Sequence, residues 1–196
     1  MSPANLAGKR AGLILNPRAQ FPLAQALHAP SGAELGAVFS FVSGLYFRGK
    51  ATYATAFARP PEEGQEGALV ISAGDGLRPL REPVTAPRLR LWADVEIDEG
   101  NDEFTRPLEQ DAAALERAYG ATTRFVLLGS VATDKYVQPL ARVFGDHLLF
   151  PSDFVGRGDM SRGALMLTAA RTGVELAYEP VESAARRGRR ATSARR

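Results

Sequence analysis

Residues 147–163 read HLLFPSDFVGRGDMSRG and lead into the apolar run ALML at 164–167. This order predicts a short strand, a glycine-rich polar loop and the start of a helix. Backbone N–H groups in such a loop can converge on an anion, and a helix N-terminus adds partial positive charge. Arg157 and Arg162 supply full positive charges beside them. We therefore expect this stretch to contact a ligand that bears a phosphate or a carboxylate.

The glycine-rich loop departs from two familiar phosphate-binding motifs. The dinucleotide fingerprint requires a third glycine where Ser161 stands, and the P-loop requires Lys-Ser or Lys-Thr directly after Gly163. These departures argue against ATP hydrolysis and classical NAD binding, and we predict no cofactor. The alternative is a purely structural loop in which the arginines pair with Asp153 and Asp159.

Length and composition are typical of one compact domain with a substantial core. The chain has 196 residues, of which 45% are hydrophobic, and we expect a single domain over residues 1–180. The absence of cysteine excludes disulfides, thiolate metal sites and cysteine nucleophiles. With only two histidines in the chain, we predict no metal site.

The last residues differ sharply from the rest of the chain. Residues 181–196 are rich in alanine, serine, glycine and arginine, and from Ser183 onward they contain no acid. We expect a disordered tail. Its arginines would add salt-dependent, sequence-independent affinity for nucleic acid, or would simply be solvated. They are Arg186, Arg187, Arg189, Arg190, Arg195 and Arg196.

No membrane segment is predicted from the sequence. A membrane-spanning helix needs roughly 18 consecutive apolar residues, and no stretch of this chain reaches that length. The apolar run after Lys9 and Arg10 is too short for the core of a secretion signal. We therefore expect a soluble, cytoplasmic protein without a membrane partner.

Short apolar runs alternate with segments of helical spacing. Continuous apolar runs are typical of strands covered on both faces, as in a parallel sheet. We assign such strands to 11–15, 68–72, 124–130 and 147–150, and helices to 35–45, 51–58, 107–119, 133–144 and 161–171. Residues 78–90 are expected to be irregular, and 91–97 to form an edge strand or a helical turn. The prediction is a three-layer α/β domain with a mostly parallel central sheet.

In such a sheet, ligands bind at the carboxyl ends of the strands. Four polar or glycine-rich loops follow the predicted strands, and we expect them to meet at one edge. Asp75 is the candidate general acid or base, because the glycines around it would let its side chain project into the crevice. The alternative is an aspartate that stabilises its own turn. The candidate ligand-binding residues are Ser72, Gly74, Gly76, Gly129, Ser130, Lys135, Tyr136, Asp153, Gly156, Arg157, Gly158, Ser161 and Arg162.

The order of these motifs resembles a group of microbial α/β domains related to the base-recognition domain of archaeosine synthase and to the peroxide-stress protein family. Five segments carry the resemblance: Leu45-Tyr46-Phe47, Ser72 to Leu77, Leu128-Gly129, Tyr136-Val137 and Pro151 to Gly163. The cysteine and lysine that often follow the first strand of that pattern are replaced here by Asn16-Pro17-Arg18. The resemblance implies a pocket for a nucleobase or nucleotide.

The sequence thus predicts a domain that binds a nucleotide, a nucleobase or a nucleic-acid segment, and it leaves open whether the protein catalyses a reaction on that ligand. Two alternatives remain. One is a non-catalytic interaction protein with a structural glycine loop, and the other is a small-molecule transferase or hydrolase. A serine hydrolase is disfavoured, because the chain has no Gly-x-Ser-x-Gly motif.

Overall fold

Helices, rather than a central sheet, build most of this fold. The computed structural model describes residues 1–183, and of these residues about 52% are helical and only 11% are in strands. The predicted three-layer α/β domain with a mostly parallel sheet is therefore wrong. The strands are two to four residues long, so most of the apolar surface is buried where helices pack on one another. The arginines of the predicted tail lie outside the described residues.

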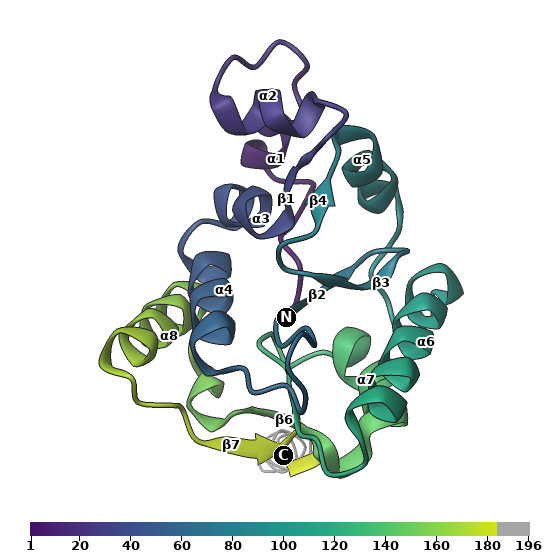
Figure 1. The fold of residues 1–196 in the computed structure, drawn as a ribbon, viewed down its shortest axis with the longest axis vertical. Helices are drawn as coiled ribbons and strands as arrows, with labels where there is room; N and C mark the ends of the chain where they lie inside the picture. Colours follow the sequence, from purple (N-terminus) through teal and green to yellow (C-terminus); the bar gives the residue numbers. More distant parts are fainter. Residues whose placement is uncertain (184–196) are drawn as a thin grey trace, which may run out of the picture.

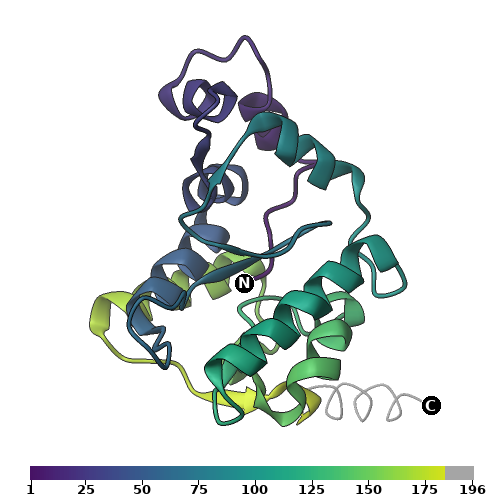
Figure 2. The same ribbon diagram turned by 45° about the vertical axis from the view of Figure 1, so that its right-hand side comes forward.

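Figures 1 and 2 show how the elements are arranged: α4 and α8 lie side by side, α6 and α7 form a second pair, and α1, α2, α3 and α5 gather at one end. The helices are α1 (Lys9–Ile14), α2 (Pro22–His28), α3 (Leu35–Ser43), α4 (Leu45–Phe57), α5 (Ala86–Asp94), α6 (Asp102–Tyr119), α7 (Asp134–Phe144) and α8 (Asp159–Thr172), with 3-10 turns at Gly145–His147 and Ser152–Phe154.

The strands form three small, separate sheets. They are β1 (Ala33–Glu34), β2 (Leu69–Ser72), β3 (Gly76–Pro79), β4 (Pro83–Val84), β5 (Phe125–Val126), β6 (Leu148–Pro151) and β7 (Tyr178–Pro180). β1 pairs with β4 and β2 with β3, both antiparallel, whereas β6 pairs parallel to β5 and antiparallel to β7. Within the described residues, parallel pairing is thus confined to β5 and β6.

In two segments the observed secondary structure differs from the prediction. The apolar run at 11–15 lies mostly within α1, where Ala11 and Ile14 are fully buried and Leu13 is 58% exposed. This spacing of three residues is helical, and a run of five residues is too short to separate a helix from a strand by composition. Much of the region 78–90, which was expected to be irregular, forms parts of β3, β4 and α5, and α5 continues to Asp94, in agreement with the helical alternative for 91–97.

Other predicted elements are confirmed. β2 lies within the predicted strand 68–72, α7 covers nearly all of 133–144, and β6 overlaps 147–150. Gly44 separates α3 from α4 and has a φ of 63°. This left-handed conformation favours glycine and lets the chain turn between the two helices.

Residues 1 and 2 connect two of the sheets. The Met1 amino group donates a hydrogen bond to the Leu69 carbonyl at 2.7 Å, and the Ile71 N–H donates to the Met1 carbonyl at 2.9 Å. The Ser2 N–H donates to the Leu128 carbonyl at 3.1 Å. The first two residues therefore fill the gap between β2 and the segment that follows β5, near the centre of the molecule (Figure 1).

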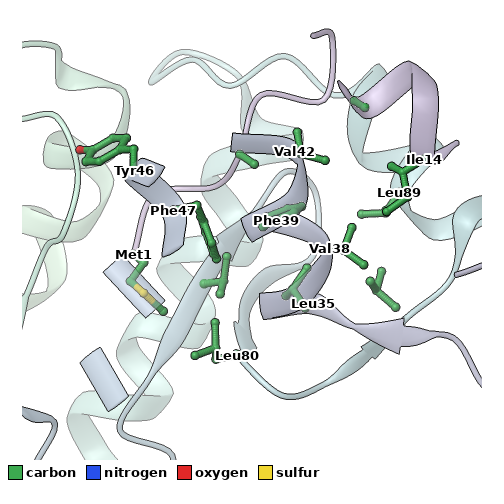
Figure 3. Packing of buried hydrophobic residues seen from close by; sticks show 14 of the residues in the cluster. Met1, Ile14, Leu35, Val38, Phe39, Val42, Tyr46, Phe47, Leu80 and Leu89 are labelled. Atoms are coloured by element: carbon green, nitrogen blue, oxygen red, sulfur yellow. The ribbon is translucent and has the colours of Figure 1, made fainter. Parts of the chain in front are cut away.

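Buried apolar side chains form two clusters. The larger joins the helices α1 to α5 and α8, and Phe39 makes edge-to-face contacts with Phe47 and Trp92. In Figure 3, Phe47 lies within this cluster while the ring of Tyr46 is directed away from it. The smaller cluster joins α6, α7 and β6. No helix within residues 1–183 is both long and apolar enough to cross a membrane.

Candidate functional site

Two glycines bring α4 and α8 into backbone contact. A Cβ atom on Gly49 of α4 would lie 2.7 Å from the Gly163 carbonyl oxygen, and one on Gly163 of α8 would lie 2.8 Å from the Leu45 carbonyl oxygen. Any side chain at either position would force the helices apart. This close crossing places the first turn of α8, including Arg162, beside the first turns of α4.

Lys50 of α4 is the most unusual side chain at this crossing. It is only 1% exposed, and its Nζ donates hydrogen bonds to the Ser2 carbonyl at 2.7 Å and to the Ser2 Oγ at 2.9 Å. The ammonium also lies 4.4 Å from the centroid of the Tyr46 ring and 4.9 Å from that of Phe47. Among the described residues, no carboxylate forms an ion pair with it.

Burial determines the protonation of this amine. It lowers the pKa of Lys50 to about 7, and the more distant Asp159 carboxylate opposes the shift. The Met1 amino group is fully buried nearby, and its burial, together with the positive charge of Lys50, lowers its pKa to about 5. A substantial fraction of Lys50 is therefore a neutral amine at neutral pH.

The Tyr46 ring covers the amine, and two further side chains lie near Tyr46: the Arg162 guanidinium and the Tyr136 phenol. The Tyr46 hydroxyl is buried, and within the described part of the chain it has no well-formed hydrogen bond. Burial raises the pKa of Tyr46, although the adjacent Arg162 guanidinium acts in the opposite direction. Burial, followed by the nearby Tyr46, raises the pKa of Tyr136 to about 12. Both phenols therefore remain protonated donors at physiological pH.

We call the group of Ser2, Tyr46, Lys50, Tyr136 and Arg162 the Lys50 site. It lies where the two apolar clusters meet, since Tyr46 belongs to one and Tyr136 to the other. The chemistry that it offers is an amine, protonated phenols and a guanidinium in a largely dehydrated setting. Such a combination suits the recognition of an anion or a carbonyl oxygen.

Several residues predicted from sequence surround this site. A Cβ on Gly129 would lie 3.0 Å from the Ser2 Cβ, so the loop after β5 runs directly past the site. Tyr136 belongs to the site itself, and the Lys135 Nζ lies 5.2 Å from the centroid of its ring. Ser130 accepts a hydrogen bond at Oγ from the Ala132 N–H in the same loop.

The glycine-rich stretch contributes mainly through Arg162. Its side chain is 13% exposed, its Nε donates to the Phe154 carbonyl at 3.1 Å, and its Nη1 lies 3.8 Å from an Asp159 carboxylate oxygen. Arg157 is exposed and donates to the Ser161 Oγ at 3.2 Å. The remaining predicted residues of this stretch, Asp153, Gly156 and Gly158, are exposed on the surface.

Asp75 has a different set of partners. Its Oδ2 accepts hydrogen bonds from the Arg88 Nε and the Trp92 Nε1, each at 2.7 Å. Burial alone would raise the pKa of Asp75, but these two donors lower it below its ordinary value. Arg88 is also paired with Glu82 at 2.7 Å. In this arrangement the carboxylate joins the β2–β3 turn to α5.

The other predicted residues near Asp75 belong to the same turn. Ser72 is fully buried and donates to the Gly76 carbonyl at 3.1 Å, while Gly74 and Gly76 have φ values of 91° and 71°. The single parallel edge that was expected to bring this turn beside the glycine-rich stretch is absent, because β2 pairs antiparallel with β3 in its own sheet.

A separate cavity of about 450 Å³ opens between the C-terminal half of α4 and the end of α6. Its wall includes Tyr53, whose hydroxyl lies 2.6 Å from that of Tyr178 and accepts a hydrogen bond from the Leu176 N–H at 2.9 Å. The Tyr178 hydroxyl in turn donates to Glu175 at 2.7 Å. Its tyrosine hydroxyls are therefore engaged in internal hydrogen bonds, unlike the hydroxyl of Tyr46.

Comparisons with protein-family models, with curated proteins and with solved structures found no match to this chain. Its function must therefore be argued from its own residues. Within residues 1–183, no group of three or more histidine or acidic side chains is placed to hold a metal ion. The Lys50 site is accordingly described by its amine, phenols and guanidinium alone.

The sequence analysis did not identify Lys50 or the first two residues. A signal for Lys50 was available, because Tyr46, Lys50, Tyr53 and Phe57 share one face at helical spacing. A lysine in the middle of an aromatic helix face stands out as a candidate. No comparable local signal exists for residues 1 and 2, whose role depends on pairing with strands distant in sequence.

Proposed function

We propose that this protein binds nucleotides, either free or within a nucleic-acid strand, with a phosphate group held at the Lys50 site. One observation carries the proposal: the buried Tyr46 hydroxyl faces the Arg162 guanidinium, and within the described residues it has no well-formed hydrogen bond. A buried polar group that lacks a partner is costly, and such groups often face a ligand. A phosphate oxygen would accept from both of these donors.

The surrounding charges support an anionic ligand. Arg162 presents several N–H donors in a rigid fork, which matches the geometry of phosphate. Lys135 and Tyr136, at the start of α7, add a second cation and a second phenolic donor. The nucleotide part of the proposal rests on the resemblance of Leu45-Tyr46-Phe47, Gly129 and Tyr136 to nucleobase-related domains.

The test is a titration of the full chain with nucleoside monophosphates, followed by calorimetry, and with labelled single- and double-stranded oligonucleotides, followed by anisotropy. We expect Arg162→Gln and Tyr46→Phe to weaken binding at least about tenfold, equivalent to about 1.4 kcal/mol. Arg171→Gln is the matched control, because it removes the same charge from an exposed position of α8. Absence of binding, or equal binding by all variants, would refute the proposal.

The arginine-rich segment beyond Ser183 supplies a second, weaker contribution under this proposal. Replacing its six arginines with glutamine in the full chain should weaken oligonucleotide binding. It should also make the affinity less dependent on salt, because with fewer phosphate contacts fewer counterions are released on binding. Binding of mononucleotides should be unchanged. If the wild-type chain and this variant bind the oligonucleotide equally well at every salt concentration, the segment has no part in binding.

A further inference from the structure

Lys50 is not explained by stability. Burying an amine is costly, and an aliphatic side chain of similar size would fill the same space without that cost. Its nitrogen has only the carbonyl and hydroxyl of Ser2 as hydrogen-bond partners among the described residues, and no carboxylate balances its charge. An amine retained in such a place is a candidate for chemistry, since perturbed groups gather at functional sites.

The geometry around Lys50 fits a nucleophilic amine. Tyr46 and Lys50 are four residues apart in α4, so they share a face, and the crossing with α8 adds Arg162 to that face. A lysine acts as a nucleophile only in its neutral form, which dehydration by the rings of Tyr46 and Phe47 favours. Tyr46 remains protonated and its ring covers the amine, so we assign its hydroxyl as the proton donor for this reaction.

We propose that Lys50 forms an imine with the aldehyde of a phosphorylated sugar whose phosphate is bound by Arg162. The inference rests on the proposed function, because it places the phosphate of this ligand in the same site. Two sources share this chemistry: a free sugar phosphate in its open-chain form, and a nucleic-acid strand that has lost a base and exposes the sugar aldehyde.

The reaction is balanced without an oxidant or a reductant. The lone pair of the neutral Lys50 Nζ attacks the carbonyl carbon, and a proton moves from nitrogen to the former carbonyl oxygen to give a carbinolamine. Tyr46 then protonates the departing hydroxyl and regains a proton from the nitrogen. One C=N bond forms and one water molecule leaves, so that amine and aldehyde yield imine and water.

Access to the amine depends on Tyr46. Lys50 is only 1% exposed, and the Tyr46 ring covers its nitrogen at 4.4 Å. A carbonyl carbon can therefore reach the amine only after the Tyr46 ring shifts from its place over the nitrogen, and the proposal includes that shift. We expect an aldehyde without a phosphate to react poorly, because Arg162 would not hold it at the site.

The test traps the imine by reduction. The full chain is incubated with ribose 5-phosphate, with an oligonucleotide containing one abasic site, or with unphosphorylated ribose, each in the presence of cyanoborohydride. Intact mass and peptide mapping then locate the adduct, which is simple because Lys9, Lys50 and Lys135 are the only lysines in the chain. We expect labelling of Lys50 at least about tenfold faster than labelling of Lys9 with one phosphorylated probe or with both, and little labelling by ribose.

Variants separate reactivity from folding. Lys50→Arg should abolish the adduct and Arg162→Gln should slow it at least about tenfold, whereas the exposed Lys9→Arg should leave the labelling of Lys50 unchanged. Competition by inorganic phosphate tests the same point on the unmodified protein. The inference is overturned if the adduct lies on Met1 or is spread evenly over the amines, or if neither phosphorylated probe is trapped.

The same samples distinguish this inference from the proposed function. Nucleotide binding that depends on Arg162 without an adduct at Lys50 overturns the imine alone. Loss of both the binding and the adduct overturns both proposals. Trapping with the abasic oligonucleotide but not with ribose 5-phosphate identifies nucleic acid as the source of the aldehyde, and the reverse result identifies a free sugar phosphate.

Discussion

Replacing Lys50 with methionine should change how the stability of this protein depends on pH. The pKa of Lys50 is about 7 in the folded chain and 10.5 in its ordinary state. Between these values the unfolded chain binds more protons than the folded chain, so the wild-type protein gains stability as the pH rises. Below about pH 7 both states are protonated and the gain disappears. A methionine at this position has no such dependence.

The size of the effect follows from the two pKa values. Integrating the proton linkage from pH 6 to pH 9 gives a gain of about 2 to 3 kcal/mol for the wild-type protein that Lys50→Met lacks. The substitution also removes both hydrogen bonds to Ser2, at a cost of about 1 to 3 kcal/mol for each acceptor left unsatisfied. That cost is the same at both pH values. The change, between pH 6 and pH 9, in the stability difference between the two proteins therefore reports the protonation of the Lys50 amine.

Urea unfolding followed by circular dichroism at pH 6 and pH 9 measures this difference. The Met1 amino group also has a lowered pKa, about 5, so its own contribution to the pH dependence of stability ends near its ordinary value of 8.0. Burial, the larger cause of its lowered pKa, remains in the variant, so this part cancels when the variant is subtracted from the wild type; the smaller part that comes from the charge of Lys50 is lost with the substitution. If the difference in the free energy of unfolding between the two proteins changes by less than about 0.5 kcal/mol from pH 6 to pH 9, the inference that Lys50 is a buried amine with a lowered pKa is wrong.

Two further experiments test structural roles: Gly163→Ala with Gly12→Ala as its control, and Asp75→Asn. Gly163→Ala should lower the stability by about 1 to 3 kcal/mol, because its Cβ would lie 2.8 Å from a backbone oxygen of α4, whereas Gly12→Ala meets open space in α1 and should raise stability by about 0.5 to 1 kcal/mol. Equal shifts in thermal unfolding would contradict the close crossing. Asp75→Asn should cost about 1 kcal/mol by weakening the bonds from Arg88 and Trp92, and should leave nucleotide affinity unchanged. Loss of affinity without loss of stability would instead place Asp75 in the binding site.

The elements that could be predicted are those with a strong local signal. α7 follows from its amphipathic spacing and β6 from its continuous apolar run. The sheet could not be predicted, because pairing is decided by contacts distant in sequence. β2 closes into a tight antiparallel hairpin with β3 through Gly74 and Gly76, and residues 1 and 2 fill the position where a parallel neighbour was expected.

The candidate site was predicted only in part, because the start of helix α4 was placed too late in the sequence. Tyr136 and Arg162 are both in the Lys50 site, and Gly129 borders it, although a parallel sheet edge did not bring them together. The helix predicted at 51–58 begins six residues too late, since α4 starts at Leu45. That late start left Lys50 in a connecting segment and hid its place on the aromatic face of the helix.

The glycine-rich stretch acquires a different physical role from the one its composition suggests. Its exposed glycines leave the loop at the surface, but Gly163 allows α8 to approach α4 so closely that a side chain would meet backbone. This close approach places Arg162, the residue directly before Gly163, beside Tyr46, whose ring covers Lys50. Under the proposed function, anion binding by this stretch would depend less on backbone N–H groups in the loop than on the helix crossing that sets Arg162 beside a buried phenol.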